Sequence, residues 1–171
     1  MNRTLLVLAG MAGCASAFPG PLFARSSAAS ELVYIGMHGN ELTADLVTSR
    51  WNATTGTLTA IGQQRTHMTG KTGPTSGSEI IVSGDGRFLY VGSRSDNALF
   101  VYALDGISGK ASQVQRLSSG GAVPWSFVLS PDGHWLLVCN EQSDKVRVFA
   151  RNNRSGRLCK GQVVRTGSHP A

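Results

Sequence analysis

Cysteine and histidine are the residue types of this 171-residue chain that could hold a metal or supply a nucleophile, but their spacing supports neither role. Cys139 lies in the apolar run LLVCN, and Cys159 follows a Ser-Gly turn, with no CxxC pair and no histidine at ligand spacing. Cys139 is therefore expected to be a buried, inert thiol. The sequence predicts no metal site and no cofactor. It leaves open whether Cys139 and Cys159 form a disulfide, because it does not show how close they lie.

The histidines and the basic residues likewise indicate an ordinary surface. His67, His134 and His169 lie in polar segments without a partner at a recognisable spacing, which is typical of solvated side chains. Lys and Arg number 16 against 10 Asp and Glu, a net charge of +6. The basic residues are scattered singly, so no stripe follows a phosphate backbone and nucleic-acid binding is not expected.

The segment that must position any site is residues 78–102, which predicts three short antiparallel strands. The runs SEIIVS, RFLYVGS and NALFVYAL are rich in β-branched and aromatic residues. Gly84, Asp85 and Gly86 supply turn formers between the first two runs, and residues 93–97 supply them between the second and third.

The same pattern returns 47 residues later, where Ser130, Asp132 and Gly133 repeat Ser83, Asp85 and Gly86. A period in the forties built of short strands and glycine turns is typical of β-propeller blades. The sequence therefore predicts an all-β fold of β-propeller blades, each an antiparallel four-stranded sheet. The propeller is expected to be incomplete, because the length allows only about three blades and propellers close with four to eight.

The predicted organisation has five parts. They are a signal peptide (1–17), a flexible lead-in (18–30), a partial first blade (31–60), a linker (61–77) and two blade repeats (78–171). The signal is indicated by an early positive charge, an apolar run at 5–12 and the small residues 15–17. An alternative is a lipoprotein signal in which Cys14 is acylated. Either signal predicts export to the periplasm or beyond, with membrane attachment only if Cys14 is lipidated.

The repeat also places candidate site residues. The first strand of each propeller blade lines the central channel. Glu79, in the first strand of one repeat, and the neighbours of Trp125, in the first strand of the next, are therefore expected at the channel mouth.

These motifs resemble the family of seven-bladed propeller lactonases, which includes bacterial 6-phosphogluconolactonases and fungal carboxy-muconate cyclases. The resemblance is carried by SEIIVSGDGRFLYVGSR at 78–94, by residues 120–149 with SPDGHWLLVCN, and by LVYIG and TGTLT near the start. The opening is similar to the family's first blade and residue 78 onward to its last two. The resemblance thus implies a truncated or internally deleted lactonase, or part of a longer gene.

The resemblance also implies roles for particular residues. Glu79 matches the family's acid, as the base or water-orienting group, and Arg94 matches an arginine that clamps a carbonyl or phosphate. Asn140, Glu141 and Trp125 would contact substrate. The open alternative is that Glu79 and Arg94 are a strand-initiating acid and a turn arginine in a weak surface ion pair.

Two functions follow from this resemblance. The first is a lactonase-like hydrolase that opens a small-molecule lactone. The family usually has arginine in place of Trp125 and glutamine in place of Glu141, so this chain has lost a cation and gained a carboxylate. That change, with export, favours an unphosphorylated lactone. The alternative is a non-catalytic exported fragment that binds a partner or assembles with itself through open blade edges.

Overall fold

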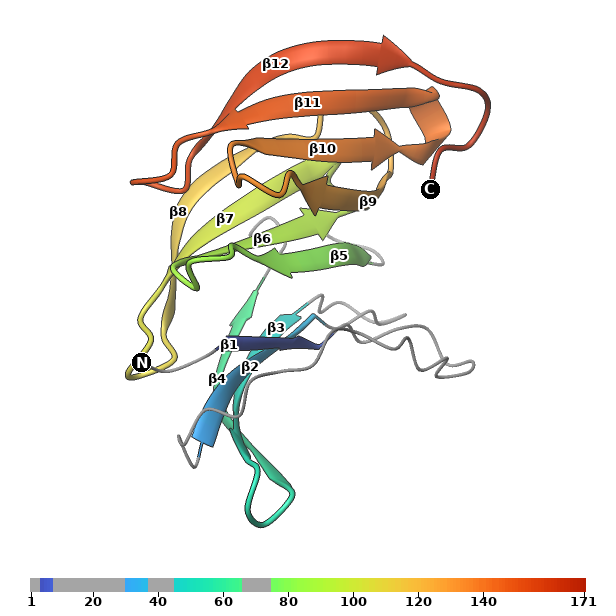
Figure 1. Cartoon of the computed structure of the whole chain (residues 1–171). Coiled ribbons are helices and arrows are strands. Elements are labelled where there is room, and N and C mark those ends of the chain that lie inside the picture. The colour runs from blue at the N-terminus through green and yellow to red at the C-terminus, as the bar shows by residue number, and fades with distance from the viewer. Residues whose placement is uncertain (1–3, 8–29, 37–44, 66–74) are drawn as a thin grey trace.

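The computed structural model describes residues 4–7, 30–36, 45–65 and 75–171, which form three four-stranded sheets (Figure 1). The first blade contains β1 (Thr4–Val7), β2 (Ser30–Gly36), β3 (Asp45–Asn52) and β4 (Thr57–Arg65). The second contains β5 (Gly77–Val82), β6 (Phe88–Ser93), β7 (Ala98–Leu104) and β8 (Ala111–Ser118). The third contains β9 (Pro124–Leu129), β10 (Trp135–Asn140), the 3-10 helix η1 (Glu141–Ser143), β11 (Lys145–Arg151) and β12 (Leu158–Arg165).

The prediction of propeller blades built from antiparallel sheets is confirmed for the second and third blades, in which every neighbouring pair of strands is antiparallel. The first blade differs at one position. Its innermost strand β1 runs parallel to β2, with Thr4 opposite Leu32. This strand falls inside the range predicted as a signal peptide, so removal of residues 1–17 would leave β2 as the inner edge of the first blade.

The predicted linker at 61–77 begins too early. β4 continues to Arg65, paired with Asp45 of β3, and residues 66–74 lie outside the described part. The sequence predicts a linker here because the segment lacks apolar periodicity. An outermost strand does not need an apolar pattern. Most of β4 is exposed, and backbone hydrogen bonds pair it with β3.

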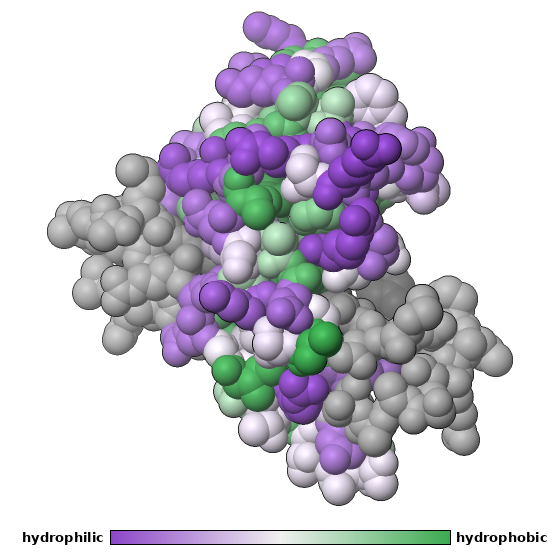
Figure 2. All heavy atoms as spheres, turned by 90° about the vertical axis from the view of Figure 1, so that its left-hand side faces the viewer, coloured by the Kyte–Doolittle hydropathy of each residue, from purple (hydrophilic) through white to green (hydrophobic). Residues whose placement is uncertain are grey.

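Apolar side chains fill the two joints between neighbouring blades. Between the first and second blades lie the buried residues Leu32, Tyr34, Leu46, Ile80, Leu89, Val91, Ala98, Phe100, Tyr102 and Ala111. Between the second and third lie Phe88, Tyr90, Leu99, Val101, Phe127, Leu136, Val138, Phe149 and Leu158. Successive residues of a strand, such as Leu89 and Tyr90, belong to opposite joints because side chains alternate across a sheet. On the side shown in Figure 2, apolar residues are visible between hydrophilic ones.

The turn between the third and fourth strands has the same construction in each blade. Asn52, Asp105 and Asn152 each accept a hydrogen bond on the side-chain oxygen from the backbone N–H two residues later, at 2.8–2.9 Å. Each turn then ends on a glycine with positive φ: Gly56 (68°), Gly109 (76°) and Gly156 (70°).

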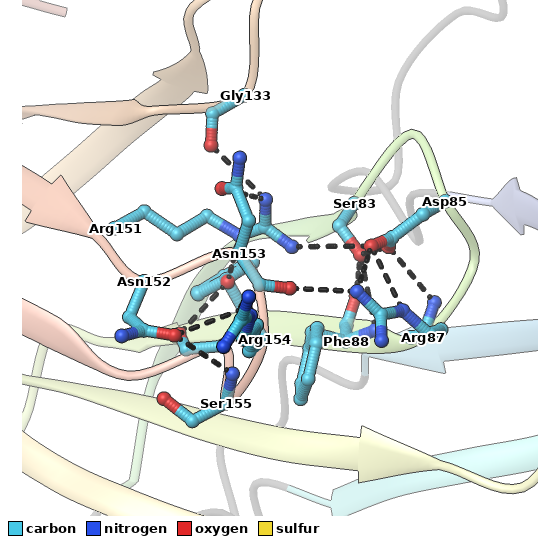
Figure 3. Close-up of polar contacts among 12 residues, drawn as sticks. Ser83, Asp85, Arg87, Phe88, Gly133, Arg151, Asn152, Asn153, Arg154 and Ser155 are labelled. Carbon is cyan, nitrogen blue, oxygen red and sulfur yellow. Dashed lines mark hydrogen bonds and ion pairs between the residues drawn. The ribbon is translucent and has the colours of Figure 1, made fainter.

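A polar network supplements the second joint (Figure 3). Arg87, in the second blade, forms an ion pair with Asp85 at 2.9 Å. It also donates a hydrogen bond of 2.7 Å to the Asn153 carbonyl of the third blade. Arg151, in the third blade, lies 3.7 Å from Asp85 and donates to the hydroxyl of Tyr90 at 2.5 Å. Because each arginine reaches the opposite blade, this network fixes how the two blades meet.

The turn glycines give a direct test of blade packing. Gly156→Ala is expected to destabilise the protein more than Gly56→Ala. A Cβ at Gly156 would overlap the Phe88 ring of the second blade, whereas a Cβ at Gly56 would meet no heavy atom within 4 Å. Both changes cost about 1 kcal/mol of backbone strain at positive φ, and overpacking adds about 1–3 kcal/mol for Gly156 alone. Urea unfolding measures the difference, and equal losses would contradict the packing.

A second test concerns pH. Burial acts to raise the pKa of Asp85, but hydrogen bonds from Ser83 and Arg87 outweigh it and leave that pKa below its usual value. Since the folded-state pKa is the lower one, the ionised carboxylate stabilises the protein above the unfolded-state pKa of about 3.9. That stabilisation is lost as the pH falls through the folded-state pKa. We expect Asp85→Asn to lower stability at pH 7 and to weaken the loss of stability in acid.

The matched control for this test is Asp132→Asn. Asp132 occupies the same place in the third blade, where its hydrogen bonds come from Ser130 and His134 of its own turn. Removing its charge should lower the free energy of unfolding at pH 7 less than Asp85→Asn does, because no arginine of another blade loses a partner. Equal effects of the two substitutions in urea titrations would show that the contact with Arg151 contributes nothing.

Candidate functional site

Four strand ends from the second and third blades meet at one end of the structure. Gly77, at the start of β5, pairs with Ser93 at the end of β6, and Pro124, at the start of β9, pairs with Asn140 at the end of β10. The innermost strands β5 and β9 also contact each other. This end lies on the right in Figure 1, where the arrowheads of β6 and β10 point. All five residues selected from the sequence lie here: Glu79, Arg94, Trp125, Asn140 and Glu141.

Glu79 projects from β5 toward the neighbouring blade. The half-buried carboxylate accepts a hydrogen bond from the backbone N–H of Phe127, on β9. Burial raises the pKa of Glu79, and the Phe127 hydrogen bond offsets this only in part. A carboxylate with a raised pKa is a better proton acceptor than an ordinary glutamate, which suits it to act as a general base.

Arg94 and Trp125 connect the same two blades. The Arg94 Nε donates a hydrogen bond to the Gly77 carbonyl at 2.9 Å, and the guanidinium lies over the Trp125 ring, 4.6 Å from its centroid. Burial lowers the pKa of Arg94, while the negative charge of Glu141 acts in the opposite direction. An arginine remains charged in any such setting. The site therefore holds a cation that is stacked on an aromatic ring and influenced by a carboxylate.

Asn140 lies at this end of the structure but is not available for the substrate contact that the resemblance implied. The side chain is fully buried, with 0% exposure, and its Nδ2 donates to the carbonyls of Ser119 at 3.3 Å and Val138 at 3.4 Å. A substrate entering from solvent cannot reach a group buried to this extent. Asn140 instead ties the start of the segment between β8 and β9 to the end of β10, which makes it a positioning residue for its neighbour Glu141.

His169 is an exposed loop residue, as its sequence context predicts, and it lies at the edge of this cluster. Its Nδ1 lies 3.5 Å from a carboxylate oxygen of Glu141, and its backbone N–H donates to Asp144 at 3.0 Å. The sequence contains a signal for this placement, because His169 precedes a proline just as Val123 does. The two residues have the same geometry: the backbone N–H of Val123 donates to the Asn97 side chain at 2.7 Å, as that of His169 does to Asp144, and both adopt φ near +55°.

The structure also answers the question about the cysteines. Cys139 lies opposite Val146 and Cys159 opposite Ala150, so β11 separates them. Two strand spacings amount to about 10 Å, which is too far for a disulfide, and both thiols are free. Among the described residues, no three His, Cys, Asp or Glu side chains are grouped to hold a metal ion. No helix in that part of the chain is long and apolar enough to cross a bilayer.

Comparison with known proteins identifies the family. A family model described as "Lactonase, 7-bladed beta-propeller" matches residues 27–170. The chain belongs to this lactonase family. A 6-phosphogluconolactonase of Bacillus subtilis is 31% identical to the chain over 118 residues, which are 69% of the chain and 34% of that relative. The resemblance inferred from the repeat motifs is thus confirmed.

Two solved structures align with most of the described chain. The periplasmic gluconolactonase PpgL of Pseudomonas aeruginosa aligns with a TM-score of 0.70 and 34% identity, over 77% of this chain and 36% of its own. A protein from Lactobacillus plantarum aligns with a TM-score of 0.73 and 30% identity, over 80% of this chain and 39% of its own. This lactonase-family chain therefore spans little more than a third of these relatives.

Proposed function

We propose that this lactonase-family protein hydrolyses a small-molecule lactone at the cluster between its second and third blades. The observation that carries the proposal is the placement of two groups at the end where two inner strands begin. They are Glu79, a carboxylate with a raised pKa, and Arg94, a cation stacked on the Trp125 ring. Ester hydrolysis requires these two functions, a base for water and a positive group for the developing oxyanion.

In the proposed reaction, Glu79 takes a proton from a water molecule, whose oxygen attacks the lactone carbonyl carbon. The carbonyl π electrons move onto oxygen, and Arg94 stabilises the resulting negative charge. When the tetrahedral intermediate collapses, the ring C–O bond breaks and the leaving oxygen takes the proton back from Glu79. The product is an open hydroxy acid, and the enzyme returns to its starting state. No cofactor enters this scheme.

Local charge supports an unphosphorylated substrate. Arg94 is accompanied by two carboxylates, Glu79 and Glu141, and Trp125 stands where the family usually has arginine. A phosphate dianion brought to this cluster would meet more negative than positive charge from these groups. A neutral sugar lactone avoids that repulsion and can lie against the Trp125 ring.

An exported location supports the same substrate. The predicted signal at residues 1–17 directs the chain out of the cytoplasm, and PpgL, 34% identical, is a periplasmic gluconolactonase. We therefore propose a periplasmic or extracellular protein, attached to the membrane only if Cys14 is acylated. Mass spectrometry of the protein recovered from cells distinguishes cleavage after Ala17 from lipidation of Cys14.

The decisive test is hydrolysis of glucono-1,5-lactone by the full chain, measured by acid release above the spontaneous rate. Glu79→Gln is expected to lower kcat about 10²–10⁴-fold through loss of the base. Activity should rise with pH through an ionisation above the usual glutamate pKa, because burial raises the pKa of Glu79 and only the ionised form accepts a proton. Arg94→Met should lower kcat about 10²–10³-fold, because the positive charge beside the developing oxyanion is lost.

The control substitution is Glu31→Gln. Glu31 is the second residue of β2, in the first blade and far from the cluster, so its substitution should leave the rate unchanged. The 6-phosphorylated lactone should react more slowly than the neutral one. A rate no higher than the spontaneous one in the folded wild-type protein would overturn the proposed function, and a preference for the phosphorylated lactone would overturn the substrate assignment.

A further inference from the structure

Val123, which leads into β9, has a backbone conformation that its residue type disfavours. Its φ is 55°, and a positive φ is a genuine outlier for a β-branched residue. Val123 also precedes Pro124, and the residue before a proline prefers an extended conformation. Strain of this kind persists only where the surrounding structure imposes it. The contacts of Val123 must therefore supply the constraint.

Both backbone polar groups of Val123 are held, and one of them is held by the neighbouring blade. The N–H donates to Oδ1 of the Asn97 side chain at 2.7 Å, and the carbonyl accepts from the Glu141 N–H at 2.9 Å. Asn97 lies in the turn between β6 and β7 of the second blade, where its own N–H donates to the Arg94 carbonyl at 3.3 Å. The residue that holds Val123 is thus part of the same turn as the site's cation.

Trp125 depends on this segment for its position. In the pairing of β9 with β10, Ser126 lies opposite Cys139 and Pro124 opposite Asn140, so Trp125 has no partner of its own on β10. An extra residue of this kind, a β-bulge, redirects a side chain. Because the ladder does not fix Trp125, its direction is set by the residues just before it, which include the strained valine two positions earlier.

The turn that carries Arg94 and Asn97 therefore contacts the entry to β9 at two points. The Arg94 guanidinium lies 4.6 Å from the centroid of the Trp125 ring, and the Asn97 side chain binds the Val123 N–H. Attraction of a cation to a ring face tolerates a range of positions over the ring, whereas a hydrogen bond to a backbone N–H is directional. The hydrogen bond thus fixes how the turn lies on the segment.

The third blade repeats this contact with an aspartate as the acceptor. Asp144, 47 residues after Asn97, also has a positive φ, 51° against 49°. The Asp144 carboxylate accepts from the N–H of His169 at 3.0 Å, and His169 has a φ of 56°. The recurrence shows that the arrangement belongs to the repeat, and that a carboxylate oxygen can take the place of the amide oxygen in it.

We propose that Asn97 is a positioning residue for the candidate site: by holding Val123 in its strained conformation, it sets where Trp125 lies and hence where Arg94 stacks. This inference rests on the proposed function, in which Arg94 stabilises the oxyanion. Stabilisation of that kind needs a charge that is placed in advance, and a misplacement of about 1 Å can lower a rate on the order of 10²-fold. Asn97 acts through Arg94 and needs no contact with the substrate.

The test begins with two substitutions of Asn97. Asn97→Gly removes the acceptor but keeps a residue that adopts a positive φ without strain, and we expect kcat for glucono-1,5-lactone to fall about tenfold. Asn97→Asp should keep most of the wild-type rate, because an aspartate can accept the same hydrogen bond, as Asp144 does. The control is Asn152→Gly, which removes a side-chain acceptor from the turn between β11 and β12, at the other end of the third blade, and should leave kcat unchanged.

A double substitution shows whether Asn97 acts through Arg94. In an Arg94→Met background, Asn97→Gly should lower kcat no further, because the cation that it positions is already gone. The same loss with and without Arg94 would overturn the proposal. So would a loss in Asn97→Asp as large as that in Asn97→Gly.

A readout that is independent of activity separates this inference from the proposed function. In NMR spectra of the full chain, Asn97→Gly should speed hydrogen exchange of the Val123 amide about fivefold, through loss of one hydrogen bond. It should also shift the indole N–H resonance of Trp125, assigned with Trp125→Phe, and Asn152→Gly should change neither signal. Unchanged signals in Asn97→Gly would overturn the positioning role even in an active enzyme. Changed signals in a chain without lactonase activity would support it and overturn the proposed function alone.

Discussion

Packing of one four-stranded sheet on the next is the interaction on which this structure depends. A blade is a thin layer with two faces, and it buries an apolar face only against another blade. The second blade shows the result, since all six residues of β6 are buried, alternately in one joint and in the other. The matching strand β10 alternates between buried and more exposed residues, because only one of its faces is covered. The order of the three blades is thus fixed by where apolar side chains find partners.

The candidate site is a consequence of the same packing. Glu79 belongs to the second blade but is held by a backbone N–H of the third, and Arg94 of the second blade lies on Trp125 of the third. Neither contact exists within a single blade. The polar network of Asp85, Arg87 and Arg151 at the opposite end of the joint limits sliding of one sheet on the other. It therefore helps to hold the site's two halves in register.

Local chemistry made most of the fold predictable. The turn formers at 84–86 and 93–97 and the β-branched runs between them predicted β5, β6 and β7 to within one residue, because these signals act over a few residues. The outermost strand β4 was partly missed. Its residues carry no apolar pattern, and only pairing with β3 makes them a strand. The parallel pairing of β1 was also beyond local signals, since strand direction depends on a distant partner.

The sequence by itself determined the repeat, the family and the residues that gather at one strand end, since a 47-residue period carries those residues to equivalent places in successive blades. Only the tertiary structure decided which of them are accessible from solvent. It buried Asn140, brought His169 beside Glu141 and separated Cys139 from Cys159 by a strand. Burial, proximity and the pKa of Glu79 depend on how neighbouring blades meet, and no short stretch of sequence contains that information.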